Sequence, residues 1–194
     1  MTLRADLELI AGWIAPGAHV LDLGCGDGAL LAHLRDAKGC RGYGVDIADG
    51  NVLAAVRNRV NVIQADLESG LRMFRDDMFD IVVLSQTLQA MRRVEDVLRE
   101  MARVARHGIV SFPNFGHWRH ILALLGGHMP VSKSIPYQWY DTPNIHLCTP
   151  KDFEILAAKL GFAIKQRALL ADGREVGFAP HLRAELAVYR FDMR

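Results

Sequence analysis

The chain of 194 residues lacks paired cysteines, an excess of one charge and long apolar runs. Cys25, Cys40 and Cys148 are odd in number and far apart, so neither a disulfide framework nor a Cys-x-x-Cys metal site is expected. We therefore predict no metal site, and reduced thiols indicate a cytoplasmic protein.

The charge balance excludes further classes of partner. Because 23 basic and 22 acidic residues give a formal net charge of +1, there is no electrostatic case for nucleic acid or an anionic membrane. No apolar run approaches the roughly 18 residues of a membrane span. Asp6 and Glu8 also stand where a signal peptide needs an apolar core. We expect neither nucleic acid nor a membrane as a partner.

The overall amino-acid composition is typical of a globular protein. Apolar residues make up 51% and charged residues 23%, and the length suits one domain with a sizeable core. We predict a single domain over residues 1–194, with a lid or insertion at about 114–149.

Residues 20–31 form the strongest motif. A short apolar run carries Asp22, stops at Gly24, Gly26 and Gly28, and is followed at once by a helical pattern. Glycine backbone takes positive φ and lies close to a ligand. The free N–H groups of the following helix favour an anionic group. The motif therefore predicts a nucleotide-type cofactor site at the carboxyl end of the first parallel strand.

Strands and helices alternate along most of the chain, which predicts βαβ units and a doubly wound, mostly parallel α/β sheet. Expected strands cover 19–23, 41–46, 60–66, 79–84, 108–112, 162–170 and 183–191. Expected helices cover 3–14, 29–35, 52–59, 94–104, 118–125 and 150–161. Because no helical periodicity separates the last two strands, we expect an antiparallel β-hairpin at the edge of the sheet. The first helix is expected to pack on the sheet, where its role is either structural or to help close the cofactor site.

Two acids follow the second and third predicted strands, at the same edge as the glycine turn. Asp46 lies about 20 residues beyond the turn, the spacing at which a carboxylate meets ribose hydroxyls in such units. Its carboxylate could accept hydrogen bonds from both hydroxyls. Ile47 would lie against the adenine face. Asp66 would accept from the adenine amino group, while the Leu67 N–H donates to the ring.

Further residues complete the predicted cofactor site. Asp22 would hold the glycine turn or meet an ammonium group, and Ser85 and Gln86 would border the reacting end. The full set of predicted cofactor-binding residues is Asp22, Gly24, Cys25, Gly26, Gly28, Asp46, Ile47, Asp66, Leu67, Ser85 and Gln86.

Each of these residues has a structural alternative. Tight strand–helix turns occur without ligands, Asp46 could cap a helix, Asp66 could be a surface acid, and Cys25 could be a small buried filler. Their order and their positions at consecutive strand ends together favour a cofactor site.

The glycine spacing distinguishes between cofactors. Dinucleotide sites prefer Gly-x-Gly-x-x-Gly, whereas residues 24–28 read Gly-x-Gly-x-Gly. This spacing, the two acids and the C-terminal strands resemble the class I S-adenosylmethionine-dependent methyltransferases. The resemblance implies a seven-stranded sheet with one reversed strand, and a glycine turn that holds the methionine end of S-adenosylmethionine or of its product S-adenosylhomocysteine.

Four stretches narrow the resemblance: 21–28, 79–89, 112–116 and 137–146. Together they resemble the MetW family of methionine biosynthesis almost from end to end, and the last is far more specific than the first. The resemblance implies a methyltransferase-fold protein that works beside a homoserine O-acyltransferase. It supplies no settled methyl acceptor.

Residues 114–149 interrupt the regular alternation, and a long irregular stretch of this kind is usually functional. A base is needed only if a methyl acceptor must lose a proton, and the candidates are His146, His117, Tyr140 and Asp141. Alternatively, His146 pins the segment onto the sheet.

Trp139 and its neighbour Tyr140 leave three roles open. They would stack on a substrate, form core under the segment, or anchor a partner protein. The sequence does not separate these roles.

Three functions remain open. The first is a regulatory partner that binds S-adenosylmethionine or its product and contacts the acyltransferase. The second is an S-adenosylmethionine-dependent methyltransferase acting on a small molecule. The third is a nicotinamide dehydrogenase, and the missing third-glycine spacing argues against it.

The ribose assignment gives a first prediction. Asp46→Ala should weaken S-adenosylmethionine binding by ~1.5–3 kcal/mol, the scale for a hydrogen bond to a charged group. Calorimetric titration of the folded variant measures this loss. An unchanged affinity would show that Asp46 does not bind the ribose.

Overall fold

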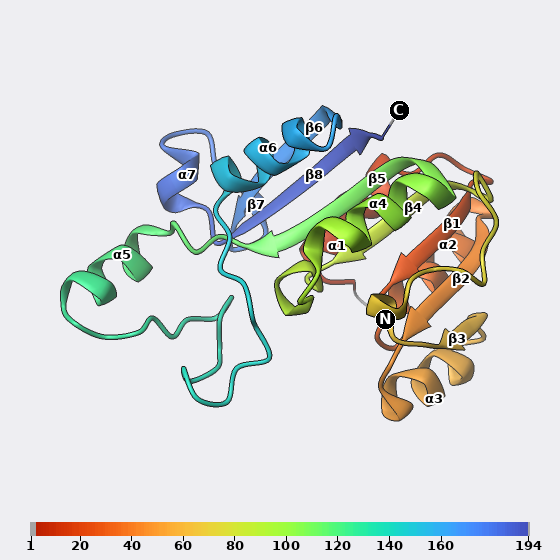
Figure 1. Ribbon diagram of the computed structural model, residues 1–194, viewed down its shortest axis with the longest axis horizontal. Coiled ribbons are helices and arrows are strands. Elements are labelled where there is room, and N and C mark those ends of the chain that lie inside the picture. Colours follow the sequence, from red (N-terminus) through yellow and green to blue (C-terminus); the bar gives the residue numbers. More distant parts are fainter. Residues whose placement is uncertain (1–2, 194) are drawn as a thin grey trace.

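The fold is built on one twisted sheet, seen in a computed structural model that describes residues 3–193 (Figure 1). Within these residues the strands lie in the order β3-β2-β1-β4-β5-β8-β6-β7. The strands are β1 His19–Leu23, β2 Arg41–Asp46, β3 Val62–Gln64, β4 Phe79–Ser85, β5 Ala105–Pro113, β6 Ala163–Ala171, β7 Arg174–Glu175 and β8 Leu186–Asp192.

Helices cover both faces of this sheet. They are α1 Ala5–Trp13, α2 Ala29–Lys38, α3 Asp49–Arg57, α4 Val94–Val104, α5 Trp118–Leu125, α6 Pro150–Lys159 and α7 Pro180–Arg183, with short 3₁₀ helices η1 Leu67–Ser69 and η2 Leu88–Ala90. Successive strand residues point to opposite faces. In β4, Val82 accordingly packs with α4 and α6, whereas Ile81 and Val83 pack with α1, α2 and α3. None of the described helices combines the length and apolar character that crossing a bilayer requires.

The predicted doubly wound sheet with antiparallel C-terminal strands is confirmed. The strands at 19–23 and 41–46 and the helices at 94–104 and 118–125 have the predicted bounds. The predicted cap of α6 is also present, because the Thr149 hydroxyl accepts from the Asp152 N–H at 3.3 Å.

The predicted C-terminal hairpin is present, because β6 and β8 pair antiparallel at one end of the sheet. Other details differ from the expectation. β8 lies next to β5, and the two-residue β7 is an eighth, outermost strand. The last strand begins at Leu186 rather than at 183, because Pro180 starts α7. A helix of four residues is too short to show a 3.6-residue period.

This topology brings the predicted site residues to one edge. Because β1 pairs in parallel with β2 and β4, and β4 with β5, their carboxyl ends meet there. The chain leaves β5 at the same edge, forms α5, and runs through residues 126–149 without a helix or strand before α6. Figure 1 shows α5 and this segment extending away from the sheet.

Candidate functional site

The glycine turn connects β1 to α2, and all three glycines have positive φ: 69° at Gly24, 57° at Gly26 and 73° at Gly28. A Cβ on Gly24 would lie 2.4 Å from the Thr87 Oγ1, and one on Gly28 would lie 2.9 Å from the Val60 Cγ2. At Gly26 no atom lies within 4 Å of that position. The outer glycines therefore serve packing, whereas Gly26 faces open space that a ligand can approach.

Asp46 holds this turn in place. Its Oδ2 accepts from the Gly26 N–H at 2.9 Å, and its Oδ1 accepts from the Ala48 N–H at 3.0 Å and from the Asn51 Nδ2 at 3.1 Å. A carboxylate offers about four acceptor positions, so one position stays free. The ribose contact stays a prediction, and loss of Asp46 would also loosen the turn.

Asp22 is almost completely buried at the end of β1, with an exposed fraction of 3%. Its carboxylate has no hydrogen-bond partner among residues 3–193, so the role of holding the turn belongs to Asp46. Burial raises the pKa of Asp22 to about 7; Arg4 opposes this rise and Asp46 adds to it. A buried carboxylate beside an open backbone would pair with an ammonium group of a ligand.

Cys25 lies against the sheet rather than over open space. A Cβ on Gly44 of β2 would lie 2.5 Å from the Cys25 Sγ, which shows how closely the thiol packs there. Burial raises the pKa of the Cys25 thiol to about 12, so it is not a thiolate at neutral pH. The side chain is a small buried filler, and contact with a cofactor stays a prediction for its backbone.

Three residues form the part of the edge predicted to hold adenine. Ile47 is 64% exposed, as an apolar platform for a ring would be. Asp66 is exposed, and its Oδ1 accepts from the Glu68 N–H at 2.9 Å as the cap of η1. The second carboxylate oxygen of Asp66 has no partner within η1. The N–H of Leu67, the first residue of η1, has none either. The adenine contacts stay predictions that this arrangement allows.

Ser85 and Gln86 contact the first turn of α1. The Gln86 Nε2 donates to the Asp6 Oδ2 at 2.9 Å, and the Ser85 Oγ lies 3.0 Å from the Ser111 Oγ. Arg4 forms an ion pair with Asp6 at 3.0 Å. The first turn of α1 thus lies against the end of β4, and the role of α1 in closing a cofactor site stays a prediction.

Asp6 is a site residue that the sequence interpretation missed. It is 5% exposed and lies four residues before Ile10, on the buried face of the helix. An acid at the helical spacing of the apolar positions was the available signal.

Gln89 is a second missed residue, and it ties the irregular segment to β4. Its carbonyl accepts from the N–H groups of Ile145 at 2.8 Å and His146 at 2.9 Å. Its Nε2 donates to the Gln86 carbonyl at 2.7 Å. Gln86 itself has a positive φ of 50°. A backbone acceptor leaves no signal in the sequence.

The candidate bases occupy other surroundings. The exposed His146 has its Nε2 3.4 Å from the Arg92 carbonyl, and the Asp141 Oδ1 accepts from the Gln138 N–H at 2.8 Å. Tyr140 is largely exposed, whereas His117 is buried at the start of α5. None of these four side chains hydrogen-bonds to a predicted cofactor residue within the described part of the chain. The contact of His146 favours the pinning role.

Comparisons with known proteins fit this geometry. The model of the family "Methionine biosynthesis protein MetW" matches residues 4–191. The "Bifunctional methionine biosynthesis protein MetXA/MetW" of Rhodopirellula baltica is 37% identical over 205 residues, covering 98% of this chain and 33% of its own length. This chain thus spans about a third of that relative.

Solved structures share the fold at low sequence identity. An S-adenosylmethionine-dependent methyltransferase from Mesorhizobium loti has a TM-score of 0.72 and 17% identity, with 97% of both chains covered. The [4+2]-cyclase SpnF has a TM-score of 0.71 and 17% identity, covering 97% of this chain and 80% of its own. The fold therefore serves more than one chemistry.

The buried Asp22 carboxylate predicts a specific pH dependence. Between about pH 4 and pH 7 the folded state keeps the Asp22 proton that the unfolded chain has lost, so its contribution to stability falls as pH rises. The slope reaches about 1.4 kcal/mol per pH unit for one proton. Asp22→Asn removes this contribution. Urea unfolding of both proteins at several pH values should show wild type losing stability relative to the variant, and a pH-independent difference would contradict the assignment.

Proposed function

Because the chain belongs to the MetW family, we propose that it binds S-adenosylmethionine or S-adenosylhomocysteine at the glycine turn and regulates a homoserine O-acyltransferase by direct contact. The proposal that the chain binds this ligand rests on the open space at Gly26 and on the buried Asp22, whose carboxylate has no hydrogen-bond partner among residues 3–193. The relative that joins MetXA and MetW in one chain supports the partner.

The residues present fit the proposed ligand. Asp22 would pair with the ammonium group of the methionine end, while the Gly26 backbone allows its close approach. The free acceptor position of Asp46 and the exposed face of Ile47 would receive the ribose and adenine. When bound, S-adenosylmethionine supplies an activated methyl group; the protein supplies alignment and removal from water.

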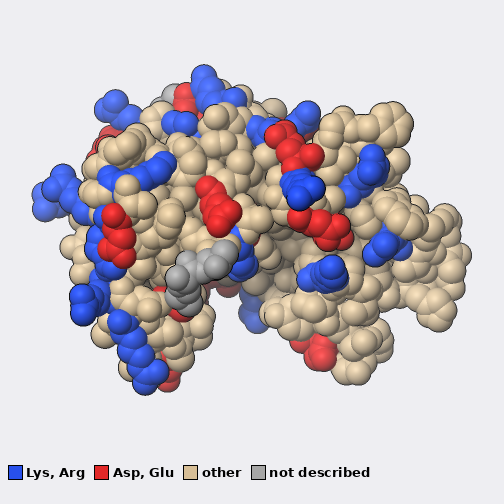
Figure 2. Space-filling view, turned by 180° about the vertical axis from the view of Figure 1, so that it is seen from behind, with Lys and Arg blue, Asp and Glu red and all other residues tan. Residues whose placement is uncertain are grey.

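The partner part is supported by the surface of α5 and the segment that follows it. Exposed large apolar side chains gather there, and patches of this kind typically mark interaction sites. They are Trp118, Ile121, Leu122, Leu124, Leu125, Met129, Val131, Tyr137, Trp139, Tyr140, Ile145 and Leu147. Figure 2 shows few charged side chains on this part of the molecule. We assign this surface to the acyltransferase and take the MetXA portion of the relative as that enzyme.

A methyltransferase acting on a small molecule is the second candidate. A cavity of about 620 Å³ beside His146 favours it, since Leu88, Phe112 and Phe153 give this cavity an apolar lining. Methyl transfer is an in-line displacement, and His146 would serve only an acceptor that must lose a proton. Release of S-adenosylhomocysteine in the presence of an acceptor would favour this candidate over regulation alone.

Gly26→Ala tests the ligand site. The added Cβ would enter the space that the ligand needs, so we expect a loss of affinity of roughly tenfold or more, on the order of 1.4 kcal/mol. Gly161→Ala is the matched control, because Gly161 also has positive φ and an open Cβ position but lies at the end of α6. Calorimetric titration with S-adenosylhomocysteine measures both. Equal losses, or no loss at Gly26, would count against the site.

Leu125→Glu tests the partner surface. Leu125 is 79% exposed on α5, and a charge buried there without a partner would weaken the complex by about 2 kcal/mol or more. Ile155→Glu on α6, where Ile155 is 69% exposed, is the control. Co-purification and acyltransferase rate should both fall for Leu125→Glu alone. A complex that survives both changes would rule out this surface.

A further inference from the structure

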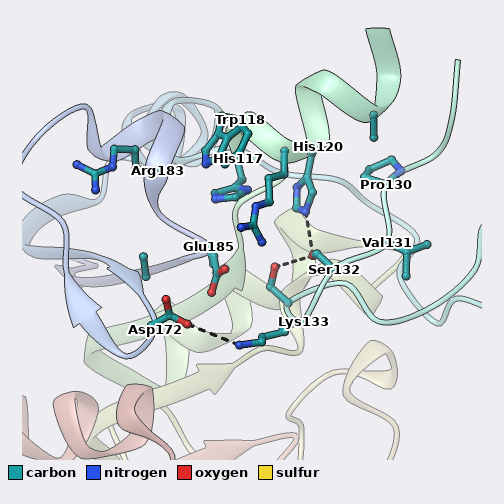
Figure 3. A pocket seen from close by; sticks show the side chains of 14 residues that line it. His117, Trp118, His120, Pro130, Val131, Ser132, Lys133, Asp172, Arg183 and Glu185 are labelled. Carbon is teal, nitrogen blue, oxygen red and sulfur yellow. Dashed lines mark hydrogen bonds and ion pairs between the residues drawn. The ribbon is translucent and has the colours of Figure 1, made fainter. Parts of the chain in front are cut away.

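A second cavity, of about 390 Å³, lies between the start of α5, residues 130–134 and the chain segments that flank β7 and α7. None of the residues that line it belongs to the predicted cofactor set. Figure 3 shows that its walls come from segments far apart in the sequence. It is therefore a separate candidate site.

Two buried imidazoles form one wall of this cavity. His120 is 1% exposed, and its Nε2 lies 2.9 Å from the Ser132 Oγ. His117 is 5% exposed, and its Nδ1 has no hydrogen-bond partner among residues 3–193. Burial lowers the pKa of both rings, so each is neutral at neutral pH and has one donor and one acceptor nitrogen. A buried polar atom of this kind calls for a partner that the chain itself does not supply, such as a water molecule or a ligand atom.

Further charged side chains line the same cavity on residues 119, 133, 172 and 185: Lys133 pairs with Asp172 at 3.8 Å, whereas Glu185 and Arg119 are not paired within the described part of the chain. The Glu185 carboxylate acts on both imidazoles, raising their pKa against the effect of burial. Within the described residues it has no hydrogen bond or ion pair. The Arg119 guanidinium lies 5.3 Å from the centre of the Trp118 ring and has no ion pair within residues 3–193. Figure 3 shows the His117 ring and the Glu185 side chain facing the same space, with Arg183 directed away from it.

We propose that this cavity binds a small zwitterion of the α-amino acid class. Its ammonium group would pair with Glu185, and its carboxylate with Arg119, while His117 Nδ1 hydrogen-bonds to one of the two groups. A simple anion would leave Glu185 unpaired beside a second negative charge. A simple amine would leave Arg119 unpaired. The inference does not depend on the cofactor proposed above, and the cavity borders the surface assigned to the partner, because Trp118 and Val131 belong to both.

Three matched probes test the class of ligand. L-Norvaline carries both charges, pentanoate lacks the ammonium group, and butylamine lacks the carboxylate. In a titration of the whole protein followed by NMR, L-norvaline should shift the His117 ring resonances saturably, and the other two should bind roughly tenfold or more weakly. Pentanoate or butylamine binding as well as L-norvaline, or no saturable shift with any probe, would overturn the proposal.

Charge-removing variants test the assigned residues. Glu185→Gln and Arg119→Gln should each weaken L-norvaline binding roughly tenfold or more, and leave the affinity for S-adenosylhomocysteine unchanged. Arg183→Gln is the matched control and should bind L-norvaline like the wild type. Arg119 is exposed, so its variant tests the site even if Glu185→Gln does not fold. Unchanged binding of L-norvaline by Arg119→Gln would contradict the proposal.

Discussion

The hydrogen bond from the Gly26 N–H to the Asp46 Oδ2, at 2.9 Å, connects the turn after β1 to the end of β2. It holds the middle one of three glycines that alternate along the turn, Gly24, Gly26 and Gly28. All three have positive φ, and only Gly26 opens onto free space. Asp46 is engaged in this way, whereas Asp22 at the same edge is buried and has no hydrogen-bond partner among residues 3–193. The open backbone of the proposed ligand site is fixed in place by this one interaction.

Two segments outside the sheet, α1 and the irregular segment before α6, also bind residues near the carboxyl ends of the strands. Asp6 in the first turn of α1 accepts from Gln86, and the Gln89 carbonyl accepts from residues 145 and 146. The N-terminal helix and the irregular segment therefore meet at the end of β4. A chain of hydrogen bonds thus runs from Gln86 at the end of β4 through Gln89 to residues 145 and 146 of the irregular segment.

Much of the fold was predictable because periodicity fixes long elements. The bounds of α4 follow from its apolar period and those of β1 from its short apolar run, and the Thr149 cap follows from its Thr-Pro-x-Asp order. α7 was missed because four residues do not complete a repeat. The insertion of β8 between β5 and β6 is a long-range pairing that local patterns do not encode.

For the candidate site, the sequence predicted which residues lie together but not the role of each one. The glycines, Asp22 and Asp46 lie together as their positions at strand ends required. The sequence could not predict which of the two acids, Asp22 or Asp46, accepts from the glycine turn, because both lie at the carboxyl ends of strands that end beside it. Gln89 acts through its backbone carbonyl on a residue more than 50 positions away, so its identity carries no signal.

A crystal structure of the protein with S-adenosylhomocysteine tests the central claim most directly. The account predicts electron density for the ligand with its ammonium group beside Asp22, its chain passing Gly26, and its adenosine between Ile47 and Asp66. Ligand density elsewhere, or an empty glycine turn at saturating ligand, would contradict it.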